Sequence, residues 1–448
     1  MLCLLLFVVT TATTPGHTQT QKGSSEPRTY AFVNVTIVPM DSERLINNQT
    51  VVVRDERIVR IGPADKMQIP ENATRIDGTG KYLMPGLVDM HVHLRDYVDP
   101  DMAALLQLYV ANGVTTVLNL SGIPRHLALR AKTANRELLG PTIYTSGPYI
   151  SRTTGSSPTP EEVEQAVIEQ KNAGYDLIKI HGDFTREAYH RLFVVARREG
   201  RLVIGHEPRN LGYEPMIEEK QDAVAHAEEY IYDKNSNTKK LDEFAAEIPV
   251  MARSTAQAGT FLVPNLTGYK SIGLQVVDLN AVLNRPEMKY MPPRTVEVWK
   301  EATNPYMRFK GLNIDRFWAN FASLQKLTKA FRDAGVRLLA GTDAMNPSVV
   351  PGYSLHDELR ELVAAGLTPY EALRTGTANP AEFLKASKEF GTVTEGKRAD
   401  LILLERNPLE DVTNTSRRMG VMIKGRWYSQ SELQKKIEAA VSLSESRQ

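Results

Sequence analysis

The chain has 448 residues, with 54 basic and 53 acidic side chains and 42% hydrophobic residues. This balance gives no electrostatic reason to expect nucleic acid or an anionic membrane surface as a partner, so a small molecule or a peptide is the expected partner. The length exceeds that of one small core and fits a barrel of about 250 residues together with a flanking domain.

An apolar run occupies residues 1–9. It is too short to span a bilayer, and its position is typical of the core of a signal peptide. It lacks the usual preceding basic residue, and a buried or disordered N-terminus is the alternative. We therefore expect a signal peptide over residues 1–20 and a periplasmic or secreted protein. Cys3, the only cysteine, falls in this segment, so the mature chain would form no internal disulfide.

Short segments with strand-like patterns lie near both ends of the chain. They are residues 31–38, 50–54, 57–62, 400–404 and 421–427. Two sets of strands at opposite ends predict a small composite β-sandwich built from both termini. Its two parts would be residues 21–85 and 386–430, and residues 431–448 would form a C-terminal helix or tail.

Between these ends, apolar strand-like runs alternate with helical patterns, which is typical of βα units around a parallel sheet. There are eight such runs, at residues 86–94, 115–120, 142–146, 177–181, 202–206, 223–226, 261–265 and 337–343. Eight is the number that closes a (β/α)8 barrel. We therefore predict an α/β protein with a (β/α)8 TIM barrel over residues 86–385.

The connection after the seventh run is far longer than the about 2 to 6 residues of a normal βα loop. It covers about residues 268–317 and is rich in Pro, Tyr, Trp and Arg. Because it leaves the carboxyl end of a strand, which is the catalytic face of a barrel, we interpret it as a lid or specificity insert. A peripheral helical decoration without substrate contact is the alternative.

The first run contains two histidines on one face. In an extended strand alternate side chains point the same way, so His91 and His93 project together with Asp89. Two neutral imidazoles held that close form half of a metal site. Asp89 lies one step deeper on the same face, and we interpret it as a supporting polar residue outside the site.

Further residues of the kinds that bind metal ions stand at the carboxyl ends of the other runs. They are Lys179, His206, His226 and Asp343. Active sites of barrels lie at that face, so these side chains would meet the two histidines of the first run. Singly, each has an ordinary explanation, such as an ion-paired lysine or a helix cap. Their common position indicates a metal centre.

Several motifs strengthen this interpretation. They are residues 84–93 (MPGLVDMHVH), 113–116, 339–343 (LAGTD), 378–381, 391–401 (GTVTEGKRADL) and 421–425. In these motifs the chain resembles the metal-dependent hydrolases of the amidohydrolase superfamily, in the branch of imidazolonepropionase-like and Xaa-Pro dipeptidase-like enzymes. The motifs extend over nearly the whole chain and are specific to the superfamily, though not to a substrate.

The resemblance implies one or two divalent ions, usually zinc. Position by position, the first ion would be held by His91, His93 and Asp343, and the second by His206 and His226. Lys179 stands where binuclear members carry a lysine carbamylated by CO2, and a carbamate offers two oxygens that can bridge ions about 3.5 to 4 Å apart. A hydroxide shared between the ions would be the nucleophile, with Asp343 as general base and then general acid.

The expected function is hydrolysis of an amide or peptide-like C–N bond in a small or non-linear amide, an N-acyl amino acid or a dipeptide. The alternatives are a mononuclear deaminase or a cyclic-amide or lactone hydrolase in which Lys179 is structural, and, less well supported, a non-catalytic scaffold. His181 and His126 are candidate substrate contacts, with a structural role equally open for both. We expect a small-molecule or dipeptide-like substrate, no nucleic acid and no membrane span, and leave a homo-oligomer open.

Overall fold

A computed structural model describes residues 28–445, apart from residues 98, 152–156, 233–237 and 312. The expected signal peptide and Cys3 lie outside the described residues, so export stays a prediction. Within the described part of the chain, no helix combines the length and the apolar character needed to cross a membrane.

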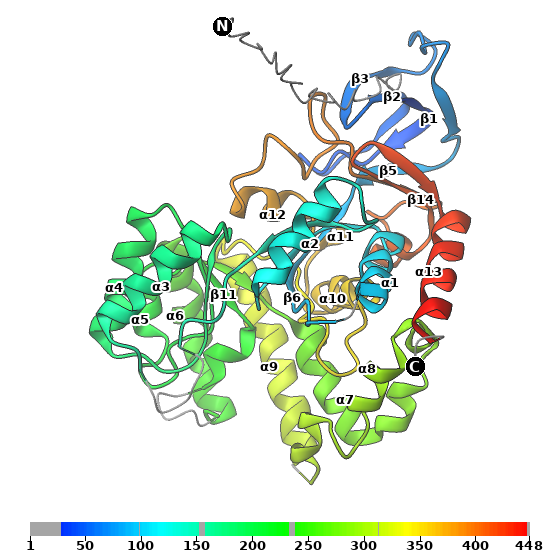
Figure 1. The fold of residues 1–448 in the computed structure, drawn as a ribbon. Helices are drawn as coiled ribbons and strands as arrows, with labels where there is room; N and C mark the ends of the chain where they lie inside the picture. Colours follow the sequence, from blue (N-terminus) through cyan, green and yellow to red (C-terminus); the bar gives the residue numbers. More distant parts are fainter. Residues whose placement is uncertain (1–27, 98, 152–156, 233–237, 312, 446–448) are drawn as a thin grey trace, which may run out of the picture.

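Strands from both ends of the chain pair in one mixed sheet (Figure 1). Its members are β1 (Thr29–Ile37), β2 (Ile46–Arg54), β3 (Arg57–Pro63), β4 (Thr74–Asp77), β5 (Tyr82–Pro85), β13 (Leu401–Leu404), β14 (Arg418–Ile423) and β15 (Arg426–Ser429). The two ends are joined where β13 pairs antiparallel with β5, Leu403 opposite Leu83. The sequence predicted this union of the termini as a sandwich. The strands instead share one sheet, because the two halves of β1 pair with β4 and β5 in turn.

The central strands form two parallel sheets. One contains β6 (Leu87–Val92), β7 (Val114–Asn119) and β8 (Thr142–Thr145), and the other β9 (Ile178–Ile180), β10 (Val203–Gly205), β11 (Ala223–Ala225) and β12 (Phe261–Val263). These are the first seven strands that the alternating pattern predicted. An isolated parallel bridge between Ser146 and Leu177 connects the two sheets. The strands are short and fully buried, as expected for parallel strands covered on both faces.

The eighth predicted strand, residues 337–343, is not a regular strand. Its backbone lies against β12, where Leu339 N donates to Leu262 O at 2.8 Å. On the opposite side, toward β6, Ala340 O accepts a hydrogen bond from Met90 N at 2.9 Å, but Ala340 N donates to the carbonyl of Thr375 at 2.8 Å. The pairing with β6 is therefore incomplete, and the segment lacks the continuous ladder of a regular strand.

Asp89 completes the connection between this segment and β6. Its buried carboxylate accepts hydrogen bonds from Thr342 N at 3.0 Å and Thr342 Oγ1 at 2.7 Å. It also accepts one from His91 N at 3.2 Å. Asp89 therefore has the supporting role that the sequence suggested, and it fixes the two segments that carry His91 and Asp343.

Helices flank the parallel strands and the mixed sheet (Figure 1). They are α1 (Asp99–Ala111), α2 (Pro124–Ala134), α3 (Pro160–Ala173), α4 (Arg186–Arg198), α5 (Glu214–Glu218), α6 (Leu241–Ala258), α9 (Ile314–Asp333), α10 (Tyr353–Ala364), α11 (Pro369–Thr375), α12 (Ala378–Phe383) and α13 (Gln430–Glu445). Capping residues in the sequence determine where several of these helices begin and end. In α3, Thr159 and Glu162 form a capping box, and Gly174 at φ 89° ends the helix.

The long connection after β12 is helical. It contains α7 (Leu266–Leu283), η2 (Pro286–Tyr290), α8 (Pro293–Val298) and η3 (Pro305–Phe309), and it leads into α9. We call residues 266–313 the insert. The carboxylate of Glu358 on α10 holds its first turn by accepting hydrogen bonds from Leu266 N at 3.2 Å and Thr267 N at 2.7 Å. The insert is therefore attached to the helical layer at its root.

Candidate metal centre

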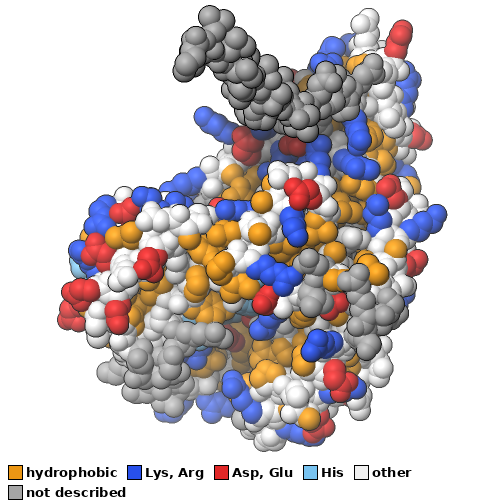
Figure 2. Space-filling model, in the orientation of Figure 1, with side chains coloured by type: hydrophobic (Ala, Val, Ile, Leu, Met, Phe, Trp, Pro, Cys, Tyr) orange, Lys and Arg blue, Asp and Glu red, His pale blue; other side chains and the backbone are white. Residues whose placement is uncertain are grey.

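A cavity of about 1180 Å³ opens where the parallel strands end. Figure 2 shows this face hollowed between the part that contains α3–α6 and the part that contains the insert, with hydrophobic side chains along the hollow. All six residues that the sequence placed in a metal site line the cavity: His91, His93, Lys179, His206, His226 and Asp343. The structure thus brings together residues from distant parts of the chain.

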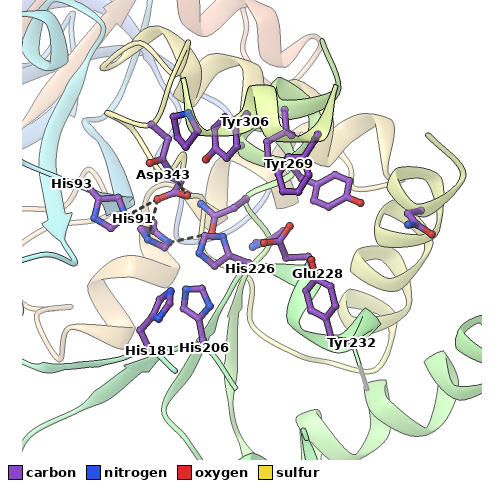
Figure 3. Close-up of a pocket in the computed structure, with 18 of the residues that line it drawn as sticks. His91, His93, His181, His206, His226, Glu228, Tyr232, Tyr269, Tyr306 and Asp343 are labelled. Carbon is purple, nitrogen blue, oxygen red and sulfur yellow. Dashed lines mark hydrogen bonds and ion pairs between the residues drawn. The ribbon is translucent and has the colours of Figure 1, made fainter. Parts of the chain in front are cut away.

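His91 and His93 face one carboxylate. Oδ1 of Asp343 lies 3.3 Å from His91 Nε2 and 2.6 Å from His93 Nε2 (Figure 3). The other ring nitrogen of His91 lies 3.2 Å from Asn265 Oδ1, and that of His93 lies 3.4 Å from the hydroxyl of Tyr149. These outer contacts hold each ring with Nε2 toward the cavity, which is the arrangement that a metal ligand needs.

Two residues of the site have left-handed backbone conformations. Asp343 has φ 64° and His226 has φ 78°. Such conformations cost about 1 to 3 kcal/mol for residues other than glycine, and they persist where the surroundings impose them. Here Asp343 N donates to His91 O at 2.8 Å, and His226 N donates to Val263 O at 2.9 Å. The surrounding structure therefore holds both residues in an unfavourable backbone conformation that directs their side chains into the cavity.

The remaining histidines continue the cluster. The ring centroid of His226 lies 4.7 Å from that of His91 and 4.8 Å from that of His206. Candidate ligand atoms of His91, His226 and Asp343 all lie within 4.8 Å of one another. Imidazole and carboxylate groups at this spacing are able to hold a divalent metal ion.

Lys179 is buried beside these residues. Its side chain is 1% exposed, and its amine has no hydrogen-bond partner within the described chain. Burial lowers the pKa of Lys179 to about 8, although the carboxylates of Asp343 and Glu229 oppose this shift. A buried lysine without a fixed partner is costly for a purely structural role.

Electrostatics favour the neutral, metal-binding form of the histidines. Burial, followed by the charge of Lys179, lowers the pKa of His91 well below its usual value. Burial lowers the pKa of His226 to about 4. Burial alone would raise the pKa of Asp343, but His91 and His93 outweigh it and keep that pKa well below the usual range. His91 and His226 therefore offer neutral imidazoles, and Asp343 offers an ionised carboxylate.

Two glutamates of this site were not predicted from the sequence. Glu229 is fully buried, and its Oε1 lies 2.7 Å from His206 Nδ1 and 3.2 Å from Arg209 Nη2. Glu228 lines the cavity between His226 and Tyr232 (Figure 3). The available signal was their position in the chain, since both follow His226 closely on the 3-10 helix η1 (Ala227–Ile231).

The two histidines suggested as substrate contacts have different places. His181 lines the cavity and packs against His206, with ring centroids 4.2 Å apart. His126 does not line it. It lies at the start of α2, where Nδ1 accepts a hydrogen bond from Ile123 N at 3.3 Å and lies 2.9 Å from Asn119 Nδ2. A role for His126 in binding substrate therefore finds no support in this geometry.

The sequence matches the model of the amidohydrolase family over residues 82–428. The chain belongs to this family. Membership confirms the expectation, drawn from the motifs, of an enzyme of the amidohydrolase superfamily that acts on C–N bonds. Members of the superfamily typically bind divalent metal ions, which agrees with the ligand cluster of His91, His226 and Asp343.

Relatives of this amidohydrolase have different activities. It is 25% identical to the ochratoxinase of Aspergillus niger over 424 residues, which cover 84% of this chain and 81% of that protein. It is also 25% identical to the adenine deaminase of Rubrobacter xylanophilus over 403 residues, 85% of this chain, but it spans only 54% of the length of that enzyme. A solved Xaa-Pro dipeptidase with bound methionine shares the fold, with a TM-score of 0.67, 20% identity, and coverage of 90% of this chain and 100% of that chain.

The insert of this amidohydrolase contributes one wall of the cavity. Tyr269 of α7 and Tyr306 of η3 line it, together with Arg308 of η3 and Arg316 of α9. Tyr269 stacks on Phe317 with ring centroids 4.6 Å apart and an interplanar angle of 12°. These side chains therefore face the cavity, and the role of the insert as a lid or specificity element stays a prediction.

Proposed function

We propose that this amidohydrolase uses two divalent metal ions, zinc being the expected metal, to cleave an amide or peptide-like C–N bond in a small-molecule or dipeptide-like substrate. The observation that carries the proposal is the amine of Lys179, which is buried among three histidines and a carboxylate and has no hydrogen-bond partner among the described residues. A cationic lysine would repel metal ions, whereas its carbamate would attract and bridge them.

The residues present fit such a pair of ions. The amine of Lys179 is buried without a hydrogen-bond partner in the described chain, and Nε2 of His91 and Nε2 of His93 both face Oδ1 of Asp343 at 3.3 and 2.6 Å. The first ion would be held by His91, His93 and Asp343, the second by His206 and His226, and the carbamate of Lys179 would bridge them. A lowered pKa leaves part of the Lys179 amine neutral, which is the form that reacts with CO2.

Divalent ions, when bound, polarise the scissile carbonyl group and lower the pKa of water to near neutrality. The chain itself has to move one proton from water to the leaving nitrogen. Asp343 is placed for this transfer, because its carboxylate faces the cavity and its Oδ2 accepts a hydrogen bond from Asn346. His181 lines the same cavity beside His206 and can donate to the substrate (Figure 3).

We also infer that the two parallel sheets close into a (β/α)8 barrel through residues 337–343. The support lies on both sides of this segment. Leu338 bridges to Leu262 of β12, and Ala344 bridges to Val92 of β6. A closed ring of strands would explain why side chains from β6, β9, β10 and β11 meet at one cavity.

A mononuclear deaminase, or a cyclic-amide or lactone hydrolase, is the second candidate. It is favoured by the similarity to adenine deaminase and by the single group of His91, His226 and Asp343, which could hold one ion. In that case Lys179 would not bridge metals. The number of bound ions therefore separates the two candidates.

The deciding experiment is metal analysis of the purified protein beside its Lys179→Ala variant. We expect two equivalents of metal in the wild type, one or none in the variant, and loss of hydrolysis across a panel of dipeptides, N-acyl amino acids, lactones and adenine. Lys171→Ala is the matched control, because Lys171 forms an ion pair with Glu199 away from the cavity. Unchanged metal content and turnover in Lys179→Ala would reject the bridged site.

A further inference from the structure

We propose that Glu228 selects substrates that carry a protonated amine, and therefore that this enzyme prefers dipeptide-like amides with a free amino group to N-acylated ones. The inference rests on the proposed amide hydrolysis and identifies one of its substrate classes. It starts from a carboxylate that lines the reaction cavity but takes no part in the metal site described above.

The carboxylate of Glu228 lacks a partner. Within the described chain it forms no hydrogen bond or ion pair, although it is mostly shielded from solvent. Its neighbour Glu229 differs in this respect, since it contacts His206 and Arg209. In a cavity of this kind an ionised carboxylate without a partner is unfavourable, and either a proton or a complementary group of a ligand compensates it. A cation is the partner that compensates a carboxylate best.

Three tyrosines from three different elements surround this carboxylate. Tyr232 follows η1, Tyr269 belongs to α7 and Tyr306 to η3, and all three line the cavity with Glu228 (Figure 3). The charge of Glu228 is the largest cause that raises the pKa of Tyr232, and it adds to burial in raising the pKa of the other two. The phenols therefore stay neutral and add no second negative charge to the part of the cavity that contains Glu228.

None of the positive side chains that line the cavity forms an ion pair with Glu228 in the described chain, although the charge of Arg209 acts on it. Arg209 is engaged by Glu229 and lies over the ring of Tyr232 at 5.2 Å. Arg308 and Arg316 are exposed and line the cavity from the insert side. The cavity thus combines an inner carboxylate with outer guanidinium groups. This order suits a zwitterion, with the ammonium group bound inside and a carboxylate bound near the mouth.

The test compares matched substrates that differ only in the amine. Dipeptides found to be hydrolysed are assayed beside their N-acetyl derivatives, with wild type, Glu228→Gln and Glu297→Gln. The last is a control on the insert, where Glu297 pairs with Lys300 and does not line the cavity. We expect the wild type to favour the free amine by at least about tenfold in kcat/KM, Glu228→Gln to lose most of this preference, and Glu297→Gln to keep it.

Metal content is measured for each variant, so that a loss of metal near His226 is not taken for a loss of selectivity. If no amide is hydrolysed, the proposed function fails, and the same pair of compounds is titrated calorimetrically. Tighter binding of the free amine that depends on Glu228 would still support the inference. Equal use or binding of both compounds, an equal effect of Glu228→Gln on both, or binding of neither would overturn it.

Discussion

Glu229 lies directly behind His206, with Oε1 of the glutamate 2.7 Å from Nδ1 of the histidine. The glutamate is fully buried and is also contacted by Arg209 at 3.2 Å. A carboxylate in this place fixes the orientation of the imidazole and makes it more basic, leaving Nε2 for a metal ion. Glu229 therefore acts through His206 as a positioning residue.

Replacing Glu229 by glutamine should weaken binding of one metal ion by about 10- to 100-fold, the usual effect of removing such a partner. Titration of the metal-free protein with Zn²⁺ measures this affinity directly, and circular dichroism checks that the fold is retained. Glu218→Gln is the control, since Glu218 is exposed and pairs with Arg186. Zn²⁺ affinity equal to that of the wild type would show that the contact with His206 has no such role.

Removing metal should destabilise the folded protein. The ligand atoms of His91, His226 and Asp343 lie within 4.8 Å of one another only in the native fold, so a metal ion binds the native state preferentially. A ligand at about 100 times its Kd stabilises by about 2.7 kcal/mol. Thermal unfolding before and after chelation measures the shift, and added Zn²⁺ should reverse it. His91→Ala should respond much less to chelation, and an identical Tm of the wild type with and without metal would contradict the site.

The residues that line the proposed metal site could be found from the sequence because they follow predicted parallel strands. The carboxyl ends of such strands lie at one edge of the sheet, so residues at these ends are expected to be close in space. Glu229 could not be found this way. Its contact with His206 depends on the backbone turn at His226, with φ 78°, and on the 3-10 helix that follows. His126 shows the converse case, because its position in the sequence suggested the cavity while its side chain lies at the start of α2 and bonds to Ile123 N.

The eighth strand illustrates the same limit. Its apolar pattern was visible, but the hydrogen bonds of Ala340 and Thr342 go to Thr375 and Asp89, which are distant in sequence. Tertiary partners of this kind override a local preference for strand. The Asp89 contact also explains why a buried carboxylate stands one step below the metal ligands.

Glu358 should make stability depend on pH. Burial raises its pKa to about 8 from an ordinary value of 4.5, although the backbone of Thr267 and Leu266 opposes the shift. The folded state then holds the proton more tightly than the unfolded state. The contribution of this group to stability is therefore complete below about pH 4.5 and is lost as the pH rises through about 8.

The free energy of unfolding of the wild type should thus fall, relative to that of Glu358→Gln, between about pH 5 and about pH 9. Urea unfolding of both proteins across this range measures the difference. The variant removes the ionisation but keeps one acceptor for the first turn of α7. The exposed-site variant Glu218→Gln should run parallel to the wild type. A constant difference between wild type and Glu358→Gln would show that Glu358 keeps one charge state in both folded and unfolded protein.

Asn304 holds the insert over the cavity. Its Nδ2 donates to Gln275 Oε1 at 2.8 Å, and its Oδ1 accepts from Tyr306 N at 3.0 Å. Gln275 in turn donates to the carbonyl of Pro347 at 3.1 Å, in the loop that follows Asp343. Loss of one buried hydrogen-bond partner costs about 1 to 3 kcal/mol, so Asn304→Ala should loosen η3 without touching the metal ligands.

We therefore expect Asn304→Ala to be cut faster within the insert by limited proteolysis and to raise KM several-fold for whichever amide the enzyme hydrolyses, with metal content unchanged. Thr303→Ala is the matched control, because Thr303 is the exposed neighbour and its hydroxyl donates to the backbone carbonyls of Glu297 and Lys300. Proteolysis reports on the insert even where no substrate is in hand. Equal cutting of the two variants would show that the contact between Asn304 and Gln275 does not hold the insert in place.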